Sequence, residues 1–367
     1  MDIEKTTTGV EALTAQDSDF RYLEAMDDLV RIVDAKGHVL FENETMRRFT
    51  EMADDDAPFF PLSTATGSFT EQAVTMTELC VAGHVFAIKN SPLIEAGKVT
   101  AVIQVFRDTT IQNSMTMRLV ETNRKLKNEI VLARSIQEKM LPRLTGYGRL
   151  AFDFYYRPTE ELSGDFFDVV PLGQGRLGLY ISDVVGHGVS ASILTMFVRQ
   201  TMRSILQEER IREPATVLHL MRERFRAIRM GEGQYFSLFF ALFDTMEDTV
   251  TYANAGHACL PIVERNGQID RLDVTGRLIT WEGDRYVYKQ KIRTLEGGER
   301  FLFYTDGASE TRSAAGTEYG EKNLQHFMKQ TTGSPLSRIV TDVEQFGVGE
   351  PKDDIALVYV ENQRRDA

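Results

Sequence analysis

Short hydrophobic runs separated by polar turns mark the first hundred positions of the chain. Residues 29–33 and 38–41 are such runs, and the segment between them contains a glycine, which predicts two strands joined by a turn. Residues 85–88 and 99–106 repeat this pattern around a loop with proline and glycine, so a second hairpin is expected there. A polar stretch of helix and loop separates the two hairpins. Strands at both ends with helices between them predict a small α+β domain over residues 19–108.

A long segment without glycine or proline follows this domain. It starts at about residue 108 and stops just before Pro142, as expected of a helix. Positions d and a of a heptad repeat are filled by Leu119, Leu126, Ala133 and Met140 and by Asn123, Ile130 and Gln137. The pattern predicts a helical coiled-coil linker over residues 109–142 that joins two copies of the chain in a parallel homodimer. The alternative is one amphipathic helix docked on its own domain, because Ala and Gln make a weak seam.

The remaining residues, 143–362, carry many short apolar runs around a helical pair. Helices are predicted over residues 189–206 and 214–229. Strands are predicted over residues 152–156, 177–181, 236–243, 250–253 and 301–304. Strands before and after a helical pair predict an α+β fold in which packed antiparallel sheets form a sandwich flanked by helices.

The composition of the chain argues against some classes of binding partner and indicates a cellular compartment. The net charge of −12 disfavours binding to nucleic acid or to an anionic membrane, since phosphate contacts need clustered Lys and Arg. No apolar run reaches the ~20 residues that span a bilayer, and the polar start of the chain has no secretory hydrophobic region, so a cytoplasmic protein is expected. Residues 1–18 are expected to be a disordered tail. Cys80 and Cys259 fall in different domains, which argues against a disulfide or a cysteine zinc site.

Acidic clusters adjoin the apolar runs of the large domain, and several are followed by glycine. They are the segments around Asp165 and Asp168, around Asp183, around Asp306, and around Asp353 and Asp354. One Asp-Gly pair alone is most often a turn. Together, several carboxylates beside buried strands would repel one another and raise their own pKa values. A pair of Mn²⁺ or Mg²⁺ ions would remove this repulsion and activate a water, so that no Cys or Ser nucleophile is needed.

The N-terminal segment resembles a PAS domain, a common sensor module. The resemblance rests on VRIVDAKGHVLFEN at its start and on GKVTAVIQVFRDTT at its end. No cofactor follows from it. His38 and His84 could ligate haem and Cys80 could be a reactive thiol, but surface histidines and a buried cysteine are the preferred interpretation.

The large domain resembles the bacterial PPM-type phosphatases of the RsbU and stage II sporulation protein E group. The match rests on ARSIQEKMLP, RPTEELSGDFFDVVPL, ISDVVGHGVSASIL, ANAGH, LFYTDGASE and the final Asp-Asp, in this order. The resemblance implies hydrolysis of phosphoserine or phosphothreonine on a protein, by a site with two Mn²⁺ or Mg²⁺ ions between two antiparallel sheets.

The resemblance also assigns residues. Asp183 would bridge the two ions, and the backbone carbonyl of Val184 would complete one of them. Asp306 and Asp353 would ligate the first ion, and Asp165 the second ion or its waters; Asp354 and Asp168 are less certain and are placed behind the ligands.

Four further residues stay open at this stage. His187 could protonate the leaving seryl oxygen or cap a turn. Asn254 and His257 are expected to fix a turn near the site. Arg157 is either a phosphate clamp or, preferably, a solvated arginine at the end of a strand.

The resemblance further implies a partner and a mode of regulation. The expected substrate is a phosphorylated anti-sigma-factor antagonist, and the expected regulator is the N-terminal domain, acting through the linker on the helices that follow Asp183. The alternative is a non-catalytic signalling adaptor that binds a partner through the same fold, which the intact set of aspartates disfavours.

Overall fold

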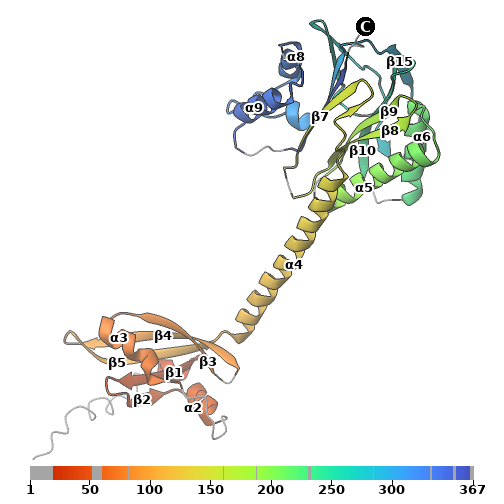
Figure 1. The fold of residues 1–367 in the computed structure, drawn as a ribbon. Coiled ribbons are helices and arrows are strands. Elements are labelled where there is room, and N and C mark those ends of the chain that lie inside the picture. Colours follow the sequence, from red (N-terminus) through yellow and green to blue (C-terminus); the bar gives the residue numbers. More distant parts are fainter. Residues whose placement is uncertain are drawn as a thin grey trace, which may run out of the picture. The chain divides into compact units, whose positions relative to one another are not determined.

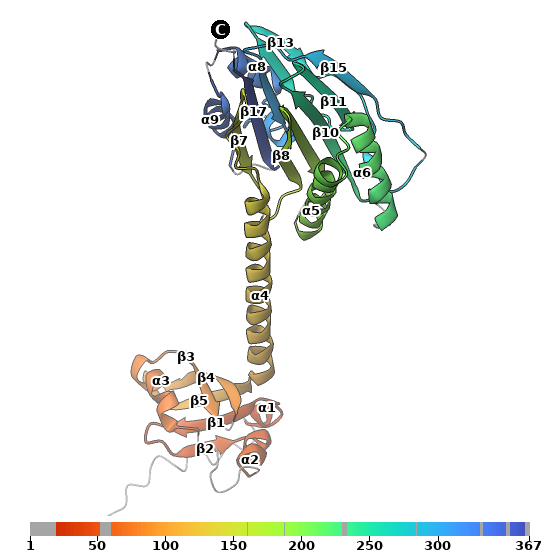
Figure 2. The ribbon, with the colours of Figure 1, turned by 45° about the vertical axis from the view of Figure 1, so that its right-hand side comes forward.

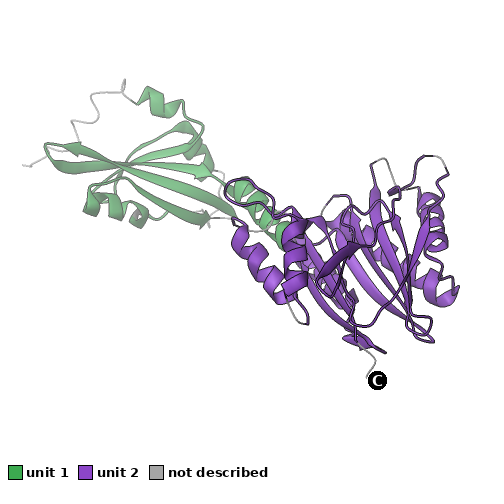
Figure 3. Ribbon diagram, turned by 90° about the horizontal axis from the view of Figure 1, so that it is seen from above, with its two compact units in different colours: residues 1–125 green, residues 126–367 purple. Residues whose placement is uncertain are grey.

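The computed structural model describes most of the chain in two compact units. The described residues are 20–51, 60–81, 83–159, 161–186, 188–229, 233–283, 285–330, 333–349 and 353–363, so the expected N-terminal tail lies outside them. The first unit is Met1–Lys125 and the second is Leu126–Ala367 (Figure 3). No helix in the described ranges is long and apolar enough to cross a membrane.

The first unit is built on one antiparallel sheet of five strands in the order β2-β1-β5-β4-β3 (Figure 1). Its strands are β1 (Leu29–Asp34), β2 (Val39–Glu42), β3 (Thr75–Val81), β4 (His84–Glu95) and β5 (Lys98–Asp108), and its helices are α1 (Arg21–Glu24), α2 (Glu44–Glu51), η1 (Leu62–Ala65) and α3 (Thr66–Glu71). Both predicted hairpins are confirmed, since β1 pairs with β2 and β4 pairs with β5. Strand β3 was not predicted.

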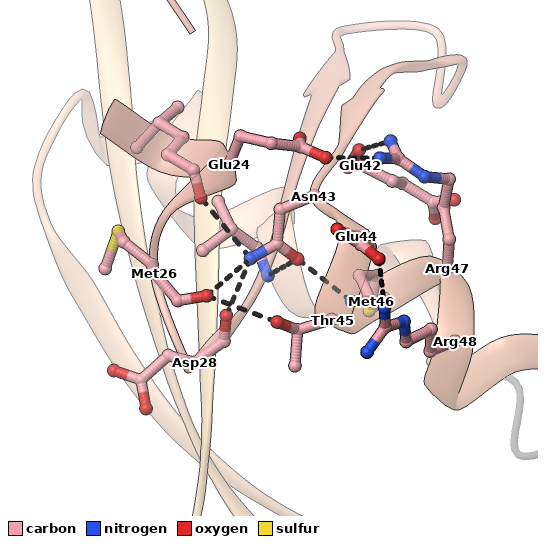
Figure 4. Close-up of polar contacts among 12 residues, drawn as sticks. Glu24, Met26, Asp28, Glu42, Asn43, Glu44, Thr45, Met46, Arg47 and Arg48 are labelled. Carbon is pink, nitrogen blue, oxygen red and sulfur yellow. Dashed lines mark hydrogen bonds and ion pairs between the residues drawn. The ribbon is translucent and has the colours of Figure 1, made fainter. Parts of the chain in front are cut away.

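A buried asparagine ties three segments of this unit together (Figure 4). The side-chain oxygen of Asn43 accepts hydrogen bonds from the backbone N–H of Val30 and of Met46, the latter in the first turn of α2. Its amide nitrogen donates to the carbonyl oxygens of Leu23, Met26 and Asp28. Asn43 therefore provides hydrogen-bond partners for the backbone at the start of α2 and for the segment that enters β1.

The polar residues singled out in this unit lie on its surface. The rings of His38 and His84 are exposed and pair with Asp34 and Asp108. Cys80 is exposed, so the expectation that it is buried was wrong. The reason is that β3 lies at the edge of the sheet and Cys80 points away from the core side chains.

Helix α4 (Thr110–Met140) runs without a break, as its sequence predicts, and Asp108 accepts hydrogen bonds from the N–H and hydroxyl of Thr110 at its start. The heptad assignment at Gln137 was wrong. Gln137 is buried against its own chain, where its amide nitrogen donates to the Ser163 carbonyl and to the Thr195 hydroxyl. It is therefore not available to a seam between two helices.

The second unit contains two antiparallel sheets of six strands each (Figure 2). The first joins β15-β11-β10-β9-β8, with β14 beside β10, and the second has the order β13-β12-β16-β17-β7-β6. The strands are β6 (Gly146–Tyr147), β7 (Leu150–Arg157), β8 (Asp165–Gly173), β9 (Arg176–Val184), β10 (Tyr235–Asp244), β11 (Thr249–Ala255), β12 (Ile262–Arg265), β13 (Gln268–Arg271), β14 (Ile279–Thr280), β15 (Gln290–Thr294), β16 (Arg300–Tyr304) and β17 (Ile355–Asn362).

Helices cover the outer face of each sheet. Helices α5 (Val189–Arg203), η2 (Ser204–Glu208) and α6 (Pro214–Ile228) pack on the first sheet, and α8 (Glu321–Gln330) and α9 (Leu336–Phe346) pack on the second, while the short α7 (Asp306–Ser309) follows β16. The predicted helical pair and all five predicted strands of this unit are confirmed, with boundaries that differ by a few residues. The predicted sandwich of antiparallel sheets flanked by helices is therefore the observed fold.

The long apolar runs in the sequence of the second unit belong to central strands, whose two faces are covered by the helices on one side and by the other sheet on the other side. In β10, Phe239 and Phe243 point into the core between the two sheets, whereas Leu238 and Phe240 point to the layer of α5 and α6. A strand buried on both faces reads as a continuous hydrophobic run. Successive side chains alternate between the faces, so the parity of a residue decides which layer it enters.

Candidate active site

Three polar side chains form a row across neighbouring strands of the first sheet. Asp165, at the start of β8, is the register partner of Asp183 in β9, and Asp183 is also the register partner of Ser237 in β10. Each has the parity of the residues that face the second sheet, such as Phe167, Ile181 and Phe239. The row therefore lies on the inner face of the first sheet.

The second sheet supplies carboxylates from two neighbouring strands. Asp306 follows the end of β16, and Asp353 precedes β17, its hydrogen-bonded neighbour. Gly307 makes this approach possible, because a Cβ at that position would lie 2.0 Å from the carbonyl oxygen of Asp354. The glycine of this Asp-Gly pair is thus required for close contact between two backbone segments.

A pocket of about 600 Å³ lies where these segments meet. Asp183 and Val184 line it from the first sheet, and Asp306, Asp353 and Asp354 line it from the second. Within the described residues, no three His, Cys, Asp or Glu side chains are placed so that they could hold a metal ion by themselves. An ion here would need waters or backbone oxygens in its shell, as Mg²⁺ and Mn²⁺ commonly have.

The electrostatics of the cluster fit a cation. Burial, and then the charge of Asp183, raises the pKa of Asp165 well above its ordinary value, and one carboxylate oxygen of Asp165 is buried without a hydrogen-bond partner. Burial, followed by the charges of Asp306 and Asp353, raises the pKa of Asp183 to about 7. Burial is also the main cause of the raised pKa of Asp353. An unpartnered buried oxygen among repelling carboxylates is stabilised by a bound cation.

Asp354 has a different environment from its neighbour Asp353. One of its oxygens accepts hydrogen bonds from the N–H and hydroxyl of Thr159, at 2.7 and 2.8 Å, and the other accepts from the N–H of Gly164 at 3.0 Å. A Cβ on Gly164 would lie 2.7 Å from the Val184 carbonyl oxygen. Asp354 therefore fixes the segment that leads into Asp165, consistent with its expected place behind the ligands.

Asp168, the other less certain residue, lies outside the pocket. It is three residues from Asp165 in the same strand, so its side chain points to the opposite face of the sheet. There it is fully buried and accepts two hydrogen bonds from Arg203 of α5, at 2.8 and 3.1 Å. The expectation that it stands behind the metal ligands was wrong; Asp168 holds α5 on the sheet.

The other open residues have separate outcomes. Asn254 and His257 do fix a turn, because the Asn254 oxygen accepts from the N–H of His257 and its nitrogen donates to the His257 carbonyl. Arg157 pairs with Glu344 of α9 at 2.5 Å, as a solvated strand-end arginine would. His187 lies outside the described residues.

Burial raises the pKa of the Cys259 thiol, which lines the pocket and stays protonated near neutral pH.

Ser237 lines the pocket and was not recognised in the sequence. Its hydroxyl lies 3.3 Å from the backbone nitrogen of Asp183 and 2.9 Å from Nδ1 of His257. A serine near the start of an apolar strand carries no motif, and only the register of β9 against β10 places it beside Asp183.

Comparison with known proteins gives one family. The family model of stage II sporulation protein E (SpoIIE) matches residues 173–363. Phosphoserine phosphatase RsbP of Bacillus subtilis is 26% identical over 245 residues, which are 64% of this chain and 58% of RsbP. Phosphoserine phosphatase RsbU of the same organism is 26% identical over 234 residues, which are 63% of this chain and 68% of RsbU. The chain thus spans little more than half the length of RsbP.

Solved structures show the same fold. The SiaA-PP2C domain of Pseudomonas aeruginosa superposes with a TM-score of 0.58 at 20% identity, over 65% of this chain and 98% of that domain. The PP2C phosphatase domain of Bacillus subtilis SpoIIE, solved with a fragment of its regulatory domain, gives a TM-score of 0.52 at 14% identity. It covers 85% of this chain and 78% of that one.

Proposed function

Because the chain belongs to the stage II sporulation protein E family, we propose that it is a metal-dependent protein serine/threonine phosphatase. The observation that carries this proposal is the meeting of Asp183, Asp306 and Asp353 from two sheets in one pocket, beside the unpartnered buried oxygen of Asp165. Such a group of carboxylates is stable when cations neutralise it.

Each aspartate has its own proposed role in binding the cations. Asp183 lines the pocket and would contact two ions, with the Val184 carbonyl beside it; Asp306 and Asp353 would hold the first ion and Asp165 the second or its waters. Two Mn²⁺ or Mg²⁺ ions would supply positive charge for the phosphate and lower the pKa of an attacking water. Because burial and the neighbouring charges raise its pKa to about 7, Asp183 is partly protonated near neutral pH before a cation binds.

Hydrolysis of p-nitrophenyl phosphate by the full chain tests the activity. We expect hydrolysis only with Mn²⁺ or Mg²⁺, and a loss of at least ~100-fold in Asp306→Asn and Asp353→Asn, since each removes a ligand. Asp273→Asn, a surface carboxylate that is 67% exposed, is the matched control and should keep full activity. Metal-independent hydrolysis would contradict the proposal, and no hydrolysis at all would favour the adaptor alternative.

We also propose the substrate class from the family. RsbP and RsbU are named phosphoserine phosphatases, and the motifs of this chain resemble that group, which favours a phosphorylated anti-sigma-factor antagonist as substrate. A panel of phosphorylated antagonist proteins from the same genome would test this, with mass spectrometry of the phosphopeptides. Hydrolysis of unrelated phosphoproteins at equal rates would contradict it.

Control by the N-terminal unit is the last part of the proposal. Helix α4 is continuous, and its Gln137 holds both Ser163, which precedes Asp165, and Thr195 of α5. A change in the packing of α4, including dimerisation through its exposed Leu119 and Leu126, would therefore reach the site through these bonds. Deletion of residues 1–109 should change the rate of hydrolysis severalfold; an unchanged rate would count against this regulation.

A further inference from the structure

A hydrogen-bonded chain of two pocket-lining side chains, His257 and Ser237, crosses from one sheet to the other. His257, which follows β11, is only 4% exposed, and its two ring nitrogens have different partners. Nε2 lies 3.1 Å from the carbonyl oxygen of Tyr304 in the second sheet, and Nδ1 lies 2.9 Å from the hydroxyl of Ser237 in the first. One imidazole thus joins β10, which carries Ser237, to β16, which leads into Asp306.

The partners fix the protons of this chain. A carbonyl oxygen only accepts, so Nε2 carries the hydrogen and donates it to Tyr304. Nδ1 is then the acceptor, and the Ser237 hydroxyl donates to it. The same hydroxyl oxygen accepts from the backbone N–H of Asp183 at 3.3 Å. Burial lowers the pKa of His257 to about 4, so the ring remains neutral near pH 7.

The chain continues on the side of the second sheet. Thr305, between Tyr304 and Asp306, accepts at its hydroxyl from the N–H of Ala356, and its own N–H donates to the Ala356 carbonyl. Ala356 lies three residues after Asp353. Hydrogen bonds joined by short stretches of backbone therefore connect the segments that carry Asp183, Asp306 and Asp353.

We propose that His257, as its neutral Nε2–H tautomer, is a positioning residue that sets the separation of Asp183 and Asp306 across the two sheets. The inference rests on the proposed function, since the separation matters when cations bind between these aspartates. Imidazole suits this position because it places a donor and an acceptor on different sides of one rigid ring. An asparagine or glutamine amide carries both groups at one end and cannot reach Tyr304 and Ser237 together.

Two variants of the full chain test the proposal. Ser237→Ala removes the middle link, and His257→Gln leaves an amide that can reach only one of the two partners, Tyr304 or Ser237. We expect each to weaken Mn²⁺ binding in titration calorimetry by about 10- to 100-fold, as for other residues that orient metal ligands. The double variant should bind Mn²⁺ no more weakly than either single variant, because both substitutions break the same series of hydrogen bonds. Hydrolysis should recover substantially at high Mn²⁺ concentration.

A neighbouring serine gives a matched control. Ser182 is also fully buried beside Asp183, but its hydroxyl donates to the Ser237 carbonyl at 2.7 Å and takes no part in the chain to His257. Ser182→Ala should lower the melting temperature about as much as Ser237→Ala and leave Mn²⁺ affinity unchanged. Equal loss of affinity in both variants, or no loss in Ser237→Ala, would overturn the proposal.

A measurement on the metal-free protein separates this inference from the proposed function. In ¹⁵N-histidine-labelled protein, the signal assigned through His257→Gln should show a protonated Nε2 and a bare Nδ1. A protonated Nδ1 would overturn the inference, whether or not the protein is a phosphatase. A wild-type chain that binds Mn²⁺ but hydrolyses no phosphate ester would overturn the proposed function alone.

Discussion

Replacing Asp183 with asparagine isolates the electrostatic penalty that the site imposes on the metal-free fold. Burial, and then the charges of Asp306 and Asp353, raises the pKa of Asp183 from 3.8 to about 7. A difference of about three units between folded and unfolded states corresponds to about 4 kcal/mol at 1.36 kcal/mol per unit. This figure is an upper bound for the variant, since the asparagine amide must also leave water.

The sign of the effect depends on pH. Because the folded-state pKa is the higher one, the contribution of this group to stability is fully present below about pH 4 and is lost as the pH rises through 7. Asp183→Asn should therefore raise the free energy of unfolding of the metal-free protein at pH 8 by up to about 4 kcal/mol. At pH 4 it should change that free energy by less than about 1 kcal/mol.

Urea unfolding in EDTA at the two pH values measures this difference. Trp281, the single tryptophan, packs against the first sheet and its helices, so its fluorescence reports on the second unit. Mn²⁺ should stabilise the wild type at pH 8 and leave Asp183→Asn nearly unaffected. The exposed control Asp273→Asn should stay within about 0.5 kcal/mol at both pH values. A loss of stability in Asp183→Asn at pH 8, or an equal gain at both pH values, would refute the reasoning.

Three further substitutions test the packing around the site and in the first unit. Gly307→Ala places a Cβ 2.0 Å from a backbone oxygen of Asp354, so it should lower the free energy of unfolding by roughly 3 kcal/mol in urea titration; an unchanged midpoint would contradict the contact. Asp168→Ala leaves Arg203, which is 31% exposed, without its carboxylate and should lower that free energy by roughly 3 kcal/mol; a smaller effect than that of a surface pair would argue against the buried pairing. Asn43→Ala should lower the melting temperature of the first unit, followed by circular dichroism, and leave the Trp281 transition in place.

The layers of the second unit could be predicted because its strands are buried on both faces. A continuous apolar run such as that of β10 is visible without knowledge of its partners. Strand β3 escaped prediction because it lies at the edge of the sheet with one face in solvent. Its sequence, TMTELCV, therefore mixes polar and apolar residues and shows no clear apolar run. The helix α4 was predictable from its lack of breakers, but the burial of Gln137 depends on contacts far away in the sequence.

The sequence predicts which acidic segments form the site, but only in part which of their side chains face the pocket. Adjacent or nearby carboxylates differ in direction: Asp353 faces the pocket, Asp354 binds the backbone of Gly164, and Asp168 points to α5. Strand parity separates Asp165 from Asp168 once the strand is known to run without a bulge between them. Register between strands, which places Ser237 beside Asp183, has no local signal at all.

The position of the carboxylates between two sheets also explains why the fold tolerates them. A penalty of about 4 kcal/mol at Asp183 is a large part of the 5–15 kcal/mol that stabilises a typical domain. The same inter-sheet layer buries Phe239, Phe243, Phe301 and Phe303, each worth about 2–3 kcal/mol relative to exposure. The aromatic core between the sheets thus offsets the repulsion among the carboxylates of the pocket. Asp183→Asn should accordingly yield an inactive protein that is more stable at pH 8 without metal, which is the opposite of what loss of a purely structural residue would do.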